Sequence, residues 1–74
     1  MIKGLAVGRI VHFTRDGENT SPAMVTKVWS RETGSVNLSI FVEDDDRPVV
    51  RETSVLYSES REPRTWRFPS RDDD

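Results

Sequence analysis

The chain has 74 residues, of which 34% are hydrophobic, and it contains no cysteine and a single histidine. This length fits one small domain, and the composition excludes disulfides, thiolate zinc sites and clusters of histidine around a metal. Because small domains with few apolar residues are often stabilised by association, we expect a homo-oligomer.

The formal net charge of −2 is unevenly distributed. Two aspartate runs, Asp44–Asp46 and Asp72–Asp74, hold six of the thirteen acidic residues, so the rest of the chain has eleven basic residues against seven acidic ones. Nine of the eleven basic residues are arginine, whose planar fork suits phosphate or carboxylate. The bias favours recognition of discrete anions, or it reflects an ordinary arginine-rich surface. We do not expect non-specific DNA binding, which depends on surplus positive charge.

The segment Leu5–Phe13 is predicted to form the first strand, with a bulge or a close backbone approach at Gly8. Its pattern, Val-Gly-x-x-Val-x-Phe, is typical of the start of an SH3-like barrel. The polar segment Arg15–Pro22 follows, and its Asp16-Gly17 pair signals a turn. We expect this segment to be the variable loop of such a barrel, where ligands are commonly bound.

The clearest pattern is a hairpin over Ala23–Glu43. Apolar and polar residues alternate along 35–42, which is the period of a half-buried strand. Gly34 suits a turn closed by a left-handed residue, because glycine adopts positive φ without steric cost. The resulting register pairs Val28 with Leu38, Thr26 with Ile40 and Met24 with Val42 on one apolar face. It leaves Val25, Trp29 and Phe41 on a second face, which either is covered by another element or a partner subunit, or forms an aromatic floor for a ligand.

The remaining elements are an acidic turn at Glu43–Pro48, a fourth strand at Val49–Leu56, a loop at Tyr57–Pro63 and a short closing strand at Thr65–Phe68. Trp66 and Phe68 share one face of the last strand and are expected to pack in the core. The prediction is an all-β fold of five strands, an SH3-like barrel or a strongly bent antiparallel sheet. One domain covers residues 1–69, and residues 70–74 form an acidic disordered tail.

Five blocks, VGRIVHF, PAMVTKVW, VNLSIFV, TSVLY and TWRFP, together resemble a family of short, mostly uncharacterised proteins of tailed bacteriophages and prophages. The resemblance covers nearly the whole chain and implies a phage origin and a small barrel. The family commonly ends in a segment like GTWHWP. This chain departs from it, with Arg64 for the glycine, Arg67 for the histidine and Phe68 for the second tryptophan, so no role of that His-Trp pair is carried over.

The sequence does not indicate an enzyme, a cofactor or a metal site. It has no nucleophile elbow, phosphate-binding loop or zinc-protease motif, and its aspartate runs lack the spaced ligands and the glycine of a calcium loop. No apolar run approaches the ~20 residues that span a bilayer, and the first residues do not resemble a signal peptide. We therefore expect a protein of the host-cell cytoplasm that does not bind membranes.

Three binding functions remain open. The first is sequestration of a small nucleotide-type signal of bacterial antiviral defence, in which aromatic rings stack on a base and arginines bind phosphate. The candidate stacking residues are Trp29, Phe41 and Tyr57, the candidate phosphate ligands are Arg9, Arg51 and Arg67, and His12 is a candidate polar contact. The second is an interaction with a phage or host protein, or a virion-accessory role. The third is binding of single-stranded nucleic acid.

Overall fold

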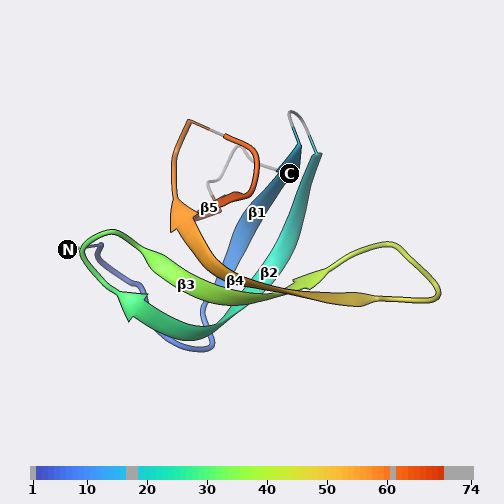
Figure 1. Ribbon diagram of the computed structural model, residues 1–74, viewed down its shortest axis with the longest axis horizontal. Helices are drawn as coiled ribbons and strands as arrows, with labels where there is room; N and C mark the ends of the chain where they lie inside the picture. Colours follow the sequence, from blue (N-terminus) through green and yellow to red (C-terminus); the bar gives the residue numbers. More distant parts are fainter. Residues whose placement is uncertain (1, 17–18, 61, 70–74) are drawn as a thin grey trace.

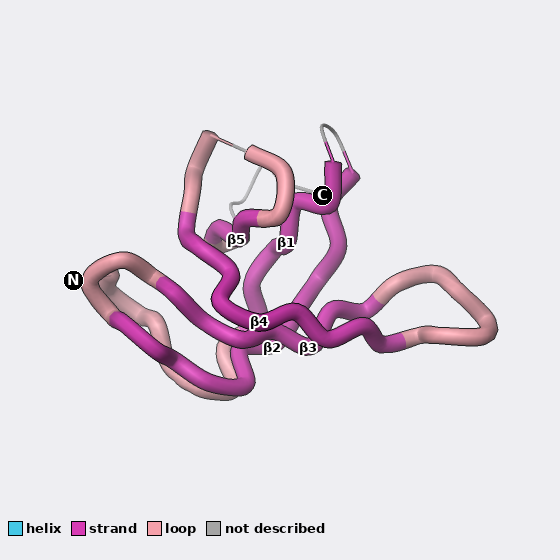
Figure 2. Tube along the Cα trace, in the orientation of Figure 1, coloured by secondary structure: helices cyan, strands magenta, loops and turns pink. Residues whose placement is uncertain are grey.

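The computed structural model describes residues 2–16, 19–60 and 62–69, and these form an all-β protein without a helix (Figures 1 and 2). Its strands are β1 (Ile10–Asp16), β2 (Asn19–Ser30), β3 (Ser35–Phe41), β4 (Val49–Tyr57) and β5 (Thr65–Arg67). They close into a barrel in the order β1-β2-β3-β4-β5. The short β5 pairs antiparallel with β1 and parallel with β4, which joins the two ends of the sheet. The predicted five-stranded, SH3-like barrel is confirmed.

The barrel interior is filled by alternate residues of each strand. Val11 and Phe13 of β1, Leu38 and Ile40 of β3, and Trp66 of β5 are all buried. The indole nitrogen of Trp66 donates a hydrogen bond to the carbonyl oxygen of Gly34 at 2.7 Å. The predicted core position of Trp66 is confirmed, and Phe68 packs beside it with 5.0 Å between the ring centroids.

Two glycines have the backbone roles that the sequence predicts. Gly34 has a φ of 77° in the turn between β2 and β3, where its amide nitrogen donates to Ser30 O at 2.9 Å. Gly8 precedes β1, and its amide nitrogen donates to Val25 O at 2.7 Å. The left-handed turn residue and the close backbone approach are therefore both confirmed.

The predicted register of the central hairpin is wrong. The structure pairs Val25 with Leu38 and Val28 with Val36, and the register shifts between Val25 and Lys27 and again between Val28 and Ser30. Each shift places an extra residue in β2 and changes which residues face inward. The second apolar face does not form as predicted, because Val25 is fully buried in the core while Trp29 and Phe41 are exposed.

The segment Arg15–Pro22 is mostly strand, which corrects the prediction of a loop. Thr14 pairs with Thr20 and Phe13 with Ser21, so β1 and β2 continue almost to the tip of their hairpin. Threonine is compatible with a strand, and a pair of hydroxyl-bearing residues across two strands, such as Thr14 and Thr20, is favourable. The expected first strand also starts later than predicted, at Ile10. The Asp16-Gly17 turn signal lies partly outside the described residues, and the predicted tail 70–74 lies wholly outside them.

Candidate functional site

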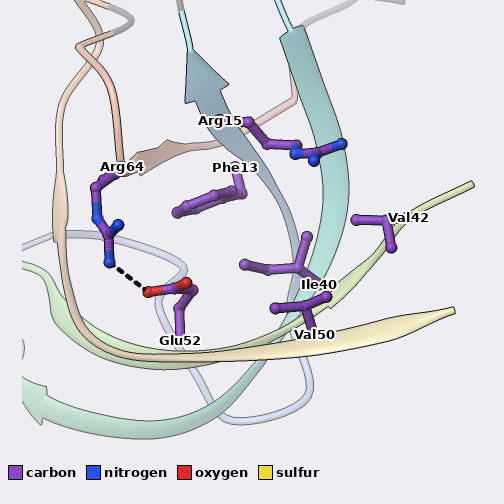
Figure 3. A pocket seen from close by; sticks show the side chains of 7 residues that line it. All are labelled: Phe13, Arg15, Ile40, Val42, Val50, Glu52 and Arg64. Atoms are coloured by element: carbon purple, nitrogen blue, oxygen red, sulfur yellow. Dashed lines mark hydrogen bonds and ion pairs between the residues drawn. The ribbon is translucent and has the colours of Figure 1, made fainter. Parts of the chain in front are cut away.

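The two long hairpins diverge at one end of the barrel and leave a corner between them. In Figure 1 the β1–β2 hairpin and the β3–β4 hairpin point in different directions from their common base. A pocket of about 210 Å³ lies in this corner (Figure 3). Its lining residues come from β1, β3, β4 and the segments next to β3 and β5: Phe13, Arg15, Ile40, Val42, Val50, Glu52 and Arg64. We call it the mouth pocket.

The floor of the mouth pocket is apolar and its rim is charged. The floor consists of core side chains: Phe13 and Ile40 are buried and Val50 is half-buried. Glu52 faces the same interior as Val50, because residues two apart on a strand share a face. An interior-facing carboxylate next to apolar side chains requires a partner.

Arg64 provides that partner. Its guanidinium Nη2 lies 3.0 Å from Glu52 Oε1, and the Arg64 side chain is 73% exposed while that of Glu52 is 27% exposed. The backbone of Arg64 has a φ of 63°, and its amide nitrogen donates to Thr14 O at 2.8 Å. A left-handed backbone costs a residue other than glycine about 1–2 kcal/mol.

A second hollow of about 290 Å³ adjoins the mouth pocket, and we call it the side pocket. It is lined by Arg15, Asn19, Thr20, Ser21, Pro22, Phe41, Val42 and Glu43. Arg15 and Val42 line both hollows. Arg15 is exposed, and it forms no hydrogen bond or ion pair with the residues that the structure describes. Its guanidinium is therefore available to an anion in either hollow.

Phe41 is the predicted site residue that the structure brings to this corner. It lies at the end of β3, is 41% exposed and lines the side pocket. Its neighbours there are three small polar side chains of β2: Asn19, Thr20 and Ser21. The corner thus combines an accessible aromatic ring, hydroxyl and amide groups and the guanidinium of Arg15.

Trp29 and Arg51 share the outer face of the sheet and lie outside both hollows. Trp29 is 56% exposed near the Ser30 end of β2, where its indole nitrogen donates to Asn37 Oδ1 at 2.8 Å. The ammonium of Lys27 lies 4.0 Å from the centroid of the Trp29 ring, a cation–π contact. Arg51 is paired with Ser39 of β3. Ser39 lies between Phe41 and Asn37, the residue that Trp29 contacts.

The other predicted site residues are dispersed. The guanidinium of Arg9 lies 5.2 Å from the centroid of the Phe68 ring. His12 and Arg67 are neighbours across β1 and β5. Arg67 is 6% exposed and donates to Thr14 Oγ1 at 2.9 Å and to Thr20 Oγ1 at 3.4 Å. These contacts hold Arg67 against the barrel wall.

Tyr57 packs on the core at the end of β4. Its ring makes an edge contact with Trp66 at 4.8 Å between centroids, and its hydroxyl donates to the carboxylate of Glu59. This hydrogen bond raises the pKa of Tyr57 to about 12, with burial and the Glu59 charge contributing in the same direction. Tyr57 is thus a neutral phenol with its ring against Trp66, outside the two hollows.

None of the seven residues that line the mouth pocket was a predicted site residue, and four of these seven are charged or aromatic: Phe13, Arg15, Glu52 and Arg64. One signal was available for Glu52, because its spacing from Val50 on a predicted strand puts a carboxylate on the interior face. Arg15 lies in the segment Arg15–Pro22, which was predicted to bind ligands as a loop, but the residue itself was not singled out. Phe13 gave no signal, because its proximity to β3 depends on how the barrel closes.

Among residues 2–16, 19–60 and 62–69, no group of three acidic or histidine side chains is close enough to hold a metal ion. Nor does the described part of the chain contain a helix long and apolar enough to cross a membrane. Comparisons of the chain with protein-family models, with curated proteins and with solved structures give no match. A function therefore has to be argued from the geometry of the mouth and side pockets.

Proposed function

We propose that the protein is a non-enzymatic binding module that sequesters a small nucleotide-type anion in the corner between its two hairpins. The observation that carries this proposal is the pair of adjoining hollows with Arg15 between them. A nucleotide has an aromatic ring and an anionic phosphate, so it needs an apolar slot and a cation at a short distance from each other. The mouth pocket supplies the slot, and Arg15 supplies the cation.

The size of the mouth pocket supports binding of one ring system rather than a whole nucleotide inside it. Pockets for drug-sized ligands typically measure ~300–1,000 Å³, whereas the mouth pocket measures about 210 Å³ and its neighbour about 290 Å³. A ring in the first hollow would extend its sugar and phosphate past Arg15 towards the second. There the phosphate would meet the hydroxyl group of Thr20 and the second amide hydrogen of Asn19, whose first is donated to Asp16 Oδ1.

The biological role that we propose follows from the resemblance to phage proteins. A phage protein that binds a nucleotide signal tightly lowers its free concentration without any chemical step, and so weakens an antiviral response that depends on that signal. Both hollows are partly open to solvent, which suits enclosure by a second copy of the chain in a homo-oligomer. Such a binder would act in the host cytoplasm, where the signal is made.

Native mass spectrometry of protein gently purified from bacterial cells tests this proposal, because it measures the subunit number and any retained small molecule together. We expect an oligomer with extra mass equal to that of a nucleotide, and loss of that mass in the variant Arg15→Gln. A species without extra mass, which also gains none when nucleotides are added to it, would contradict the proposal.

An interaction with another protein is the second candidate, and it is favoured by the apolar outer face of the sheet. Ile10 pairs with Met24 and Phe41 pairs with Val49, and all four side chains are exposed. Binding of single-stranded nucleic acid is the third candidate, because Trp29, Lys27 and Arg51 place an aromatic ring and two cations on that same face. Affinity that falls steeply with salt would identify the third candidate.

A further inference from the structure

The mouth pocket contains one feature that anion binding alone does not require, the carboxylate of Glu52. Figure 3 shows this carboxylate directed into the space that Phe13 and Ile40 border, with Arg64 on one side of it. Oε1 of Glu52 accepts a hydrogen bond from Arg64, and no described residue donates to Oε2. Oε2 and the remaining lone pair of Oε1 are therefore hydrogen-bond acceptors above an apolar floor.

The position of this carboxylate is fixed from two sides. β4 holds the Glu52 backbone through its pairing with Leu38 of β3. The backbone of Arg64 is held by its hydrogen bond to Thr14 O, in a left-handed conformation that directs the guanidinium to Glu52. A strained residue persists where the surrounding structure determines its conformation, and such positions cluster at functional sites. An ion pair built this way orients the carboxylate rather than merely neutralising it.

A carboxylate selects among ring systems by their hydrogen-bond donors. It accepts hydrogen bonds and donates none. The Watson–Crick edge of guanine presents two adjacent N–H donors, N1–H and N2–H, to such a group. Adenine presents an acceptor at its N1 position, which a carboxylate repels. A binding site whose acceptor pairs with a donor on the correct ring discriminates strongly against a ring that lacks this donor. The acceptor of the site is then left without a hydrogen bond.

We infer that the mouth pocket is specific for guanine, with Glu52 accepting hydrogen bonds from the ring edge, Arg64 holding Glu52 in place and Arg15 binding the phosphate. This inference rests on the proposed function and specifies the class of nucleotide. Phe13, Ile40 and Val50 contact the ring as apolar walls and contribute affinity without choosing the base.

Calorimetric titration of the full-length protein with GMP, IMP and AMP tests the inference. We expect GMP to bind about 10- to 100-fold more tightly than AMP, the discrimination of a good pair of hydrogen bonds to a base. IMP keeps N1–H and lacks the N2 amino group, so its affinity should be intermediate. Glu52→Gln should reduce the ratio of GMP to AMP affinity to about threefold or less, because an amide presents both a donor and an acceptor.

The control variant is Glu32→Gln, which makes the same charge change at an exposed residue of the turn between β2 and β3. It should leave the ratio unchanged. Equal affinities for GMP and AMP, or a ratio that Glu52→Gln does not alter while its circular dichroism spectrum stays that of the wild type, would overturn guanine specificity and leave the proposed function standing. Absence of binding by all three nucleotides at millimolar concentration would overturn both.

Discussion

Arg64 and Glu52 form an ion pair of 3.0 Å at the mouth of the barrel, and Arg64 forms it from a backbone with a φ of 63°. Glycine adopts this conformation freely, whereas alanine does not. We therefore predict that Arg64→Gly is more stable than Arg64→Ala by about 1 kcal/mol, since both variants lose the same ion pair and differ in backbone strain. Urea unfolding of the two variants measures the difference. Equal free energies of unfolding would show that the backbone at this position is not strained.

Arg15 should contribute to binding and hardly at all to folding. Its exposed side chain has no partner among the described residues, so Arg15→Gln should change the free energy of unfolding by less than about 0.5 kcal/mol. A hydrogen bond to a charged group is worth about 1.5–3 kcal/mol, so GMP and AMP should both bind about 10- to 100-fold more weakly to the variant. Arg47→Gln, in the exposed turn between β3 and β4, is the matched control and should bind both nucleotides normally. A loss of affinity equal in the two variants would point to overall charge rather than to a site at Arg15.

Replacement by phenylalanine should destabilise the protein at Trp66 and have little effect on its stability at Trp29. Trp66 is fully buried, and its indole nitrogen satisfies the carbonyl oxygen of Gly34. Trp66→Phe leaves this oxygen unpaired and should destabilise the protein by about 1–3 kcal/mol from that loss alone. Trp29 is 56% exposed, and Trp29→Phe should change stability by no more than about 0.5 kcal/mol. Thermal unfolding of both variants checks the contrast, and a large effect of Trp29→Phe would place that ring in an interface.

Replacing Gly34 and Gly8 by alanine distinguishes the cost of steric crowding from the cost of backbone conformation. Both have positive φ, 77° and 91°, but a Cβ atom on Gly34 would lie 2.5 Å from Ile2 Cδ1 and from Tyr57 Cβ, whereas one on Gly8 would meet no atom within 4 Å. Gly8→Ala should cost about 1–2 kcal/mol from conformation alone. Gly34→Ala should cost more, because overpacking adds to the same conformational term. Denaturant unfolding of the pair measures both, and an equal cost would mean that the core accommodates the added methyl group.

Tyr57 should ionise late. Its pKa is raised from 10 to about 12 by the hydrogen bond to Glu59, by burial and by the Glu59 charge. Because the folded protein holds the phenolic proton more tightly than the unfolded chain, this contribution to stability is complete below pH 10 and is lost as the pH rises towards about 12. Tyr57 is the single tyrosine of the chain, so its phenolate absorbance reports this group directly. Glu59→Gln should move the titration back towards pH 10, and an unchanged titration would exclude Glu59 as the cause.

Much of the fold follows from patterns within single segments. The alternation along β3, the length of β4 and the left-handed turn at Gly34 depend on neighbouring residues, and each was predicted. The register between β2 and β3 was not, because two irregularities in β2 leave no mark in its composition. In the actual register Val25 lies in the core and not on the outer surface, so the predicted second face of Val25, Trp29 and Phe41 does not form.

The site was harder to predict than the fold, since it forms between segments distant in sequence. Phe41 was proposed for its aromatic ring, and the structure places it beside Arg15 of β1 only because the two hairpins diverge from a shared base. Arg67 looked like a free cation in the sequence, but the closure of β5 onto β1 buries it against Thr14. Residue type thus suggested the chemistry, and the closure of the barrel decided which side chains are available for it.

Nuclear magnetic resonance titration of the backbone amides with GMP tests the central claim most directly, because it reports both whether a nucleotide binds and where. The account predicts shifts that concentrate at 13–15, 19–21, 41–43 and around Glu52, with little change at Trp29 and Asn37. Shifts centred on Trp29 and the outer face of the sheet, or no shifts at millimolar GMP and AMP, would contradict a nucleotide site between the two hairpins.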